Sequence, residues 1–211
     1  MQQWWTRAMS ALGGAEDVAH AAAADLASRY AEPHRRYHNA HHVGAVLHDA
    51  DRLAEKLQLR APDRAVLTLA ACAHDVVYDA RPGDDERRSA QWARDWLTRA
   101  GVAEHHVARV EELVLATLSH SAPDNDVVAS VLLDADLAIL GADRDTYDRY
   151  RRAVRAEFAA VDDAAWRIGR SQVLAGLLGK DPLFRTEPGR RTWETPAKAN
   201  LRWELEVTGA R

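Results

Sequence analysis

Cysteine is almost absent from this chain, since Cys72 is the only one among 211 residues and no disulfide can form within it. A reducing, cytoplasmic setting is therefore expected. The longest apolar stretch, near residues 66–73, is too short to cross a bilayer. The first residues, MQQWWTRAMSALGG, lack the basic and apolar regions of a signal peptide. These absences predict a cytoplasmic protein with no membrane partner.

Glycine, proline and lysine are also scarce. The chain has 11 Gly and 7 Pro, and its 28 basic residues are nearly all arginine. Alanine, leucine and arginine are abundant, and all three favour helices. The formal net charge of −4 is ordinary and gives no support for nucleic acid as a partner. Composition therefore favours an all-α protein, and it leaves the possibility of an oligomer open.

The apolar residues recur at spacings of three and four along most of the chain, which is typical of helices. No segment alternates with period two, so no sheet is expected. We predict one helical domain over 1–211, with a core at about 30–180 and a C-terminal helix at about 193–207 packed on it. The expected helices are 41–58, 64–79, 86–100, 104–119, 125–140, 144–161, 163–179 and 193–207.

Two of these helices differ in character. Residues 41–58 have one apolar stripe with charged residues in many of the gaps, which indicates an amphipathic helix. Residues 64–79 are apolar on nearly every side, which indicates a central buried helix, and Asp63 is well placed as its N-cap. Polar residues within the buried helix therefore need an explanation.

Two polar clusters interrupt this pattern. The segment YHNAHH begins the amphipathic helix, and its His38 and His42 are four residues apart, so they would share one face if the helix begins early. His74 and Asp75 lie near the end of the buried helix. Burying an unpaired carboxylate costs on the order of several kcal/mol, and a divalent cation would offset that cost. A histidine bonded to a backbone carbonyl and an aspartate bonded to neighbouring turns are the simpler alternative.

A third cluster strengthens the metal hypothesis. Asp134 and Asp136 interrupt another apolar run, LLDADLAILG. Three helices would then supply a histidine, a His-Asp pair and an aspartate. Mixed imidazole and carboxylate ligands suit Mn, Fe, Co, Ni, Zn or Mg, and open positions on such an ion accept water or a phosphate oxygen.

The segments YHNAHH, AHDVVYD, DDERRSA and LLDADLAILG, in this order, resemble the HD superfamily, and within it the small bacterial proteins described as predicted metal-dependent HD phosphohydrolases. The resemblance spans about 30–205 and implies an HD-domain-like helical bundle. It implies His42, His74, Asp75 and Asp136 as metal ligands. His38 and His41 compete with His42 for the first position, and Asp134 is the alternative to Asp136. Ala73 and Asp85 depart from the family pattern, where a large aromatic residue and asparagine are common.

The resemblance also implies an activity, the hydrolysis of a small phosphoester or a nucleotide by metal-activated water. Asp75 would orient or deprotonate that water, and Asp79 is a second candidate base. The alternative for Asp79 is a helix-ending turn with residues 81–83. A metal-binding module without turnover and, less favoured, a metal-dependent oxygenase are the competing functions.

Several further residues are candidates for the same site. His120 would join it or cap a helix C-terminus, and Glu86 with Ser89 would orient a ligand or simply begin the next helix. Arg155 and Arg170 are candidate phosphate contacts, although a solvated helix face is the favoured interpretation of both. The remaining assignments are Tyr37 and Asn39 to the pocket wall, Cys72 to the core, and Trp4 and Trp5 to packing or a dimer contact.

Overall fold

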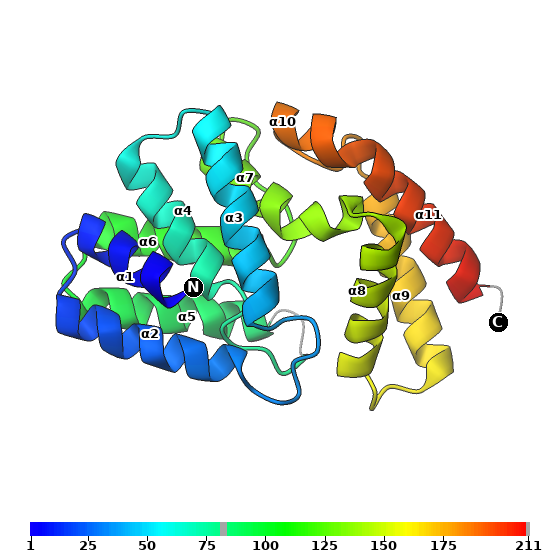
Figure 1. Ribbon diagram of the computed structural model, residues 1–211, viewed down its shortest axis with the longest axis horizontal. Coiled ribbons are helices and arrows are strands. Elements are labelled where there is room, and N and C mark those ends of the chain that lie inside the picture. Colours follow the sequence, from blue (N-terminus) through cyan, green and yellow to red (C-terminus); the bar gives the residue numbers. More distant parts are fainter. Residues whose placement is uncertain (81–83, 210–211) are drawn as a thin grey trace.

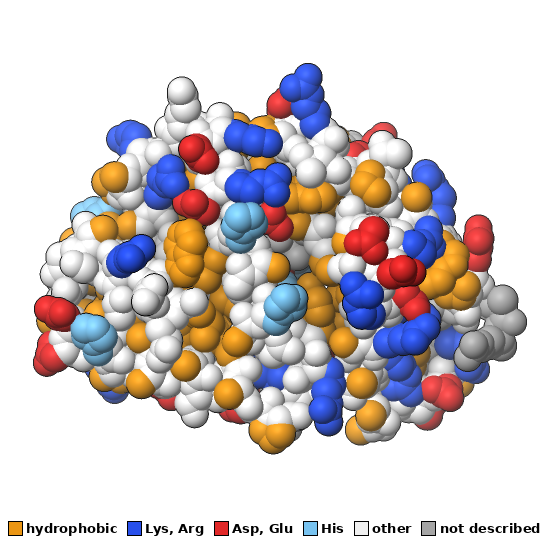
Figure 2. Space-filling model, in the orientation of Figure 1, with side chains coloured by type: hydrophobic (Ala, Val, Ile, Leu, Met, Phe, Trp, Pro, Cys, Tyr) orange, Lys and Arg blue, Asp and Glu red, His pale blue; other side chains and the backbone are white. Residues whose placement is uncertain are grey.

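The computed structural model describes residues 1–80 and 84–209, and all regular secondary structure in these ranges is helical. The prediction of an all-α chain is therefore confirmed. None of the described helices is both long and apolar enough to cross a membrane. Acidic and basic side chains lie among one another over the face drawn in Figure 2.

The helices fall into two groups joined by the end of α7 (Figure 1). The first group holds α1 (Gln2–Ala11), α2 (Glu16–Tyr30), α3 (Ala40–Lys56), α4 (Ala61–Ala73), α5 (Asp84–Arg99), α6 (Glu104–Ala116) and α7 (Val127–Asp136). A 3-10 turn, η1 (Leu137–Gly141), leads to α8 (Arg144–Glu157), α9 (Asp163–Leu178), the short α10 (Glu187–Gly189), a π-helical turn η2 (Arg190–Glu194) and α11 (Thr195–Gly209).

Helix α4 lies at the centre of the first group and packs against α1, α3, α5, α6 and α7. Eight of its residues are buried, as its all-round apolar sequence predicts. Helix α3 presents its apolar stripe to α4 and α7. These three helices meet at the place where the polar clusters of the sequence converge.

Helix α11 packs on η1 as well as on α9, and α10 contacts α3 of the first group. Gly141 at the end of η1 is needed there, since a Cβ atom would lie 2.6 Å from the Cβ of Trp193. Inside this group Arg170 of α9 and Glu204 of α11 form a buried ion pair, with Nε 2.8 Å from Oε1.

Some predicted boundaries are wrong. The helix expected at 64–79 is α4, which ends at Ala73, so the His-Asp pair follows the helix. Asp63 lies in the first turn of α4, and Arg60 is its N-cap. The turn proposed for residues 81–83 lies outside the described residues.

The core also begins earlier than residue 30. Helices α1 and α2 were not expected, yet they contribute Trp5, Met9, Leu26 and Tyr30 to the same buried cluster as the rest of the chain. Many of the buried residues of α2 are alanines, and short side chains give little apolar contrast between its faces. Trp5 packs on Trp92, with ring centroids 5.1 Å apart. Packing is therefore the correct assignment for Trp5.

Candidate metal centre

Three helix ends bring the predicted ligands together. His42 lies in the first turn of α3, whose start is fixed by Asn39, because the Asn39 side chain accepts a hydrogen bond from the His41 amide. His74 is the C-cap of α4, and Asp75 follows it directly. Asp136 is the last residue of α7. Because α4 packs against both α3 and α7, the four side chains converge.

The ligand atoms are close. The two imidazole Nε2 atoms of His42 and His74 are 3.2 Å apart. Asp75 Oδ2 lies 3.4 Å from His42 Nε2 and 3.1 Å from His74 Nε2. Asp136 Oδ1 lies 3.4 and 3.5 Å from the same two nitrogens. Three of the predicted ligands, His42, His74 and Asp136, therefore meet at one point, and Asp75 contacts the two histidines beside them.

These separations fit a bound cation. Two ligand atoms that each lie about 2.1 Å from one ion are about 3.0 Å apart at a right angle and about 3.4 Å apart at the tetrahedral angle. The five distances between imidazole nitrogens and their partners run from 3.1 to 3.5 Å. His42, His74 and Asp136 form the group whose ligand atoms all lie within 4.8 Å of one another, and Asp75 contacts both of its histidines.

The proton positions at His74 support the same conclusion. Its Nδ1 lies 2.9 Å from the carbonyl oxygen of Ala71, so Nδ1 carries a proton and donates it there. The Nε2 lone pair of the neutral ring then points at the cluster, as it does in histidines that bind metals. If both rings carried a proton on Nε2, two donor hydrogens would lie between the Nε2 atoms of His42 and His74, which are 3.2 Å apart. A cation held by both lone pairs avoids that conflict.

Charge is concentrated at this point. Burial opposes ionisation of Asp75, yet the neighbouring His74 and His42 hold the pKa of its carboxyl well below the usual range. Burial likewise opposes ionisation of Asp136, and hydrogen bonds with His120, His42 and His74 lower its pKa strongly. Burial disfavours the charged form of His74, but without an ion Asp75 and Asp136 raise its pKa well above the usual value, so a bound cation would take the place of the proton on Nε2. Both carboxylates are therefore ionised and available to a cation at neutral pH.

A buried arginine joins two of the ligand-bearing segments. Arg35 is 5% exposed, and its guanidinium donates to the carbonyl oxygens of His38, Asp75 and Val76 at 3.0, 2.7 and 2.9 Å. It thereby links the residues that precede α3 to the His-Asp pair that follows α4. Because carbonyls outside a helix need partners when buried, Arg35 stabilises the irregular backbone at the site.

A buried glutamate fixes His38. Oε1 of Glu157, at the end of α8, accepts hydrogen bonds from the three successive amides of residues 36–38 at 2.7 to 2.9 Å. Its Oε2 lies 2.7 Å from His38 Nδ1 and 3.1 Å from the Tyr78 hydroxyl. Burial opposes ionisation, but His38 and these amides lower the pKa of Glu157 to about 2. His38 therefore has a fixed orientation and lines the pocket beside the cluster.

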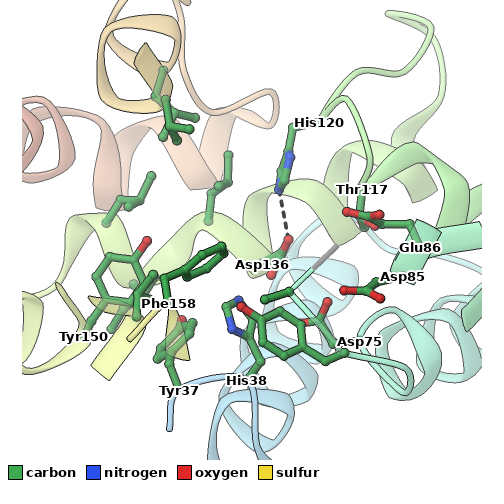
Figure 3. A pocket seen from close by; sticks show the side chains of 18 of the residues that line it. Tyr37, His38, Asp75, Asp85, Glu86, Thr117, His120, Asp136, Tyr150 and Phe158 are labelled. Carbon is green, nitrogen blue, oxygen red and sulfur yellow. Dashed lines mark hydrogen bonds and ion pairs between the residues drawn. The ribbon is translucent and has the colours of Figure 1, made fainter. Parts of the chain in front are cut away.

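Two other predicted residues also line this pocket. His120, in the segment between α6 and α7, has Nε2 3.0 Å from Asp136 Oδ2 (Figure 3). It follows the end of α6 by several residues, so it does not cap that helix. Glu86 faces the pocket from α5. Ser89, one turn later, exchanges hydrogen bonds with the backbone of Val77 and so holds the segment after the His-Asp pair.

Asp134 and Asp79 lie elsewhere. The Asp134 carboxylate accepts hydrogen bonds from the amides of Arg185 and Thr186 and from the Thr186 hydroxyl, and it holds the loop that precedes α10. Asp79 is exposed and pairs with Arg88 of α5 at 2.6 Å, and it is not among the pocket-lining residues. Neither carboxylate reaches the cluster.

The competing histidine and the two candidate phosphate contacts do not belong to the ligand cluster. His41 is exposed on α3. Arg155 donates to the carbonyls of Phe158 and Val161 and to Asp163, so it holds the turn between α8 and α9. Arg170 is buried against Glu204. The solvated helix face favoured for both arginines is therefore incorrect for Arg170.

Of the remaining residues, Tyr37 lines the pocket and packs against His42, with the ring centroids 4.7 Å apart and the rings tilted by 40°. Cys72 is a buried core residue, and burial raises the pKa of its thiol to about 12. Sequence reasoning missed Arg35 and Glu157. Neither breaks an apolar pattern, and a residue pairing with backbone atoms far along the chain leaves no periodic signal.

The chain matches no protein-family model, no curated protein and no solved structure. Its own residues therefore carry the functional inference.

Proposed function

We propose that this protein is a metal-dependent phosphohydrolase that acts on a small phosphoester. The observation that carries the proposal is the convergence of two imidazole nitrogens and two carboxylates from α3, α4 and α7. Asp75 and Asp136 of this cluster reach the wall of a pocket of about 330 Å³. A ligand set that opens into a pocket suits catalysis, because a catalytic ion needs positions open to water and substrate.

His42, His74, Asp75 and Asp136 would hold the ion. A divalent ion in that place offsets negative charge on a phosphate group and makes water a stronger nucleophile at neutral pH. The donor set of nitrogen and oxygen suits Mn, Fe, Co, Ni, Zn or Mg. The resemblance to the HD superfamily implies the same ligands and the same class of reaction.

The remaining steps depend on side chains of the chain. Asp75 faces the pocket and would accept a proton from the water whose oxygen forms the new bond to phosphorus. The bond between phosphorus and the ester oxygen breaks, and the alcohol that leaves must gain a proton. His38 is placed to donate it, since Glu157 holds its Nδ1 and leaves Nε2 for the pocket. His120 would keep Asp136 in orientation through their hydrogen bond.

A test measures release of inorganic phosphate from a panel of phosphoesters and nucleotides. The purified chain is stripped of metal and then given Mn, Co, Ni or Mg. We expect turnover with at least one ion, and a fall of at least 100-fold in kcat for Asp75→Asn, because that change removes both a ligand and the proposed base. Asp95→Asn, an exposed carboxylate on α5, is the matched control and keeps full activity.

Three results would contradict the proposal. Full metal occupancy without turnover of any ester would indicate a metal-binding module. Unchanged activity of Asp75→Asn would remove this residue from the reaction. Oxygen consumption that depends on the metal would instead favour an oxygenase.

A further inference from the structure

The pocket has two chemically different sides (Figure 3). Asp75, Asp85 and Glu86 lie on one side, with Asp136 and His120 between the two. Tyr37, Tyr150 and Phe158 lie on the other side. The lining continues beyond these aromatic rings with aliphatic side chains from η1, α8 and α9, namely Ile139, Leu140, Val154, Val173 and Leu177. A ligand that binds across the pocket therefore meets charge at one end and hydrocarbon at the other.

The arginine in the apolar side does not change its character. Arg170 is the one Lys or Arg among the described residues that line this pocket. Both oxygens of Glu204 accept hydrogen bonds from it at 2.8 and 3.0 Å, and its Nη2 also donates to the Tyr150 hydroxyl at 3.3 Å. Its charge is balanced by a carboxylate that is itself buried. Arg170 therefore closes the pocket as part of a neutral pair.

The nearby lysine is also engaged. Lys180 donates to the backbone carbonyls of Ser119 and His120 at 3.4 and 3.0 Å, and it is not in the lining. The carboxylates that line the pocket are those of Asp75, Asp85 and Glu86 on one side and of Asp136 next to them. An ion held beside Asp75 and Asp136 would therefore place the phosphate group of the substrate at this end of the pocket.

The alcohol part of the substrate faces the apolar side. Sugar or ribose hydroxyls buried against aliphatic side chains lose their hydrogen bonds to water without gaining others, and this disfavours their binding. Compact hydrocarbon suits the same wall, and the volume of about 330 Å³ is at the small end of the range for ligand pockets. We propose that the substrate is a phosphate ester of a compact, uncharged, hydrocarbon-rich alcohol, with its alcohol part against Phe158 and Val173. This inference rests on the proposed phosphohydrolase function.

A matched pair of esters tests the substrate inference. The assay uses the full-length chain loaded with the most activating ion. Cyclohexylmethyl phosphate and glucose 6-phosphate are both phosphates of primary alcohols on a six-membered ring, so their intrinsic reactivity is similar. We expect kcat/KM to be at least about 100-fold higher for the cyclohexyl ester. AMP and ATP are expected to be no better than glucose 6-phosphate.

A binding measurement gives a readout that is independent of turnover. The phosphonate in which a methylene replaces the ester oxygen of cyclohexylmethyl phosphate is titrated calorimetrically into the Mn-loaded protein. Val173→Asn places an amide on the apolar wall at a half-exposed position and is expected to weaken phosphonate binding roughly tenfold. Ile168→Asn lies on the same helix, is more exposed and does not line the pocket, so it is the matched control with unchanged binding.

The outcomes separate the two proposals. Equal or faster hydrolysis of glucose 6-phosphate or AMP overturns the substrate inference and leaves the phosphohydrolase proposal intact. Tight phosphonate binding that is weakened by Val173→Asn, together with no hydrolysis of any ester, supports the ligand class and overturns the reaction. Phosphonate binding that Val173→Asn leaves unchanged overturns the inference.

Discussion

Replacing Glu157 by glutamine tests how the second group of helices positions His38. Glutamine has nearly the same shape, and its amide oxygen can still accept from the three amides of residues 36–38. Its NH₂ group cannot accept the hydrogen bonds that Oε2 receives from His38 and Tyr78. Two hydrogen bonds to a buried charge are therefore lost, while the three amides of residues 36–38 keep their acceptor.

The size of the effect follows from the pKa. A fall in the carboxyl pKa from 4.5 to about 2 corresponds to about 3 kcal/mol of stability at neutral pH. The side chain is 1% exposed, so solvent screening is small. Because the folded-state pKa of Glu157 is lowered, this stabilisation is present above pH 4.5 and is lost as the pH falls toward 2.

Urea unfolding of the metal-free protein measures this contribution of Glu157 to the free energy of unfolding. At pH 7 the Glu157→Gln variant is expected to be about 3 kcal/mol less stable than the wild type. Below about pH 4.5 the difference narrows by about 1.4 kcal/mol for each pH unit, since the wild type then protonates Glu157 on unfolding. Equal stability at pH 7, or a difference that is constant from pH 7 to pH 3.5, would refute this reasoning.

Three further predictions concern the support of the site. Arg35→Lys leaves buried carbonyls without partners and should lower the free energy of unfolding by about 2–4 kcal/mol in urea titrations, and no loss of stability would contradict its linking role. Gly189→Ala places a Cβ against the Asp134 carboxylate and should lower the free energy of unfolding by about 2–3 kcal/mol. Gly176→Ala has open space around the added Cβ and should raise the free energy of unfolding by up to about 1 kcal/mol, because alanine favours a helix more than glycine does. Chemical denaturation compares the two variants, and equal effects would contradict the packing at Gly189. Removing the metal with EDTA should destabilise the fold by about 3 kcal/mol relative to protein at 100 times the Kd of the ion, and thermal melts that coincide with and without Mn would count against a native metal site.

The sequence predicts the chemistry at the centre better than its surroundings. His74, Asp75 and the pair Asp134 and Asp136 stand out by their polarity within apolar helical patterns, because burying such groups needs a compensating charge. The choice of His42 and of Asp136 comes from the resemblance to the HD superfamily. The same reasoning leaves Asp134 and Asp136 as alternatives, since both interrupt one apolar run. The fold separates them, because the loop at Arg185 and Thr186 covers Asp134.

The supporting residues could not be predicted in this way. Arg35 acts on carbonyls about 40 positions further along the chain, and Glu157 acts on amides about 120 positions earlier. Such pairings depend on tertiary structure, and they involve backbone groups that every residue has. Helix α2 was missed because an alanine-rich segment has little contrast between its faces, although burial of Leu26 and Tyr30 makes it part of the core.

The metal content of the purified chain tests the central claim most directly. Equilibrium dialysis against Mn or Co, followed by elemental analysis, is applied to the wild type, Asp136→Asn and His41→Ala, with circular dichroism to confirm folding. His41 is adjacent to His42 in sequence but exposed, so it is the matched control. We expect at least one ion per chain in the wild type and in His41→Ala, and a Kd at least tenfold weaker in folded Asp136→Asn. A folded wild type that binds no ion, or Asp136→Asn with unchanged affinity, would contradict the assignment of the metal centre.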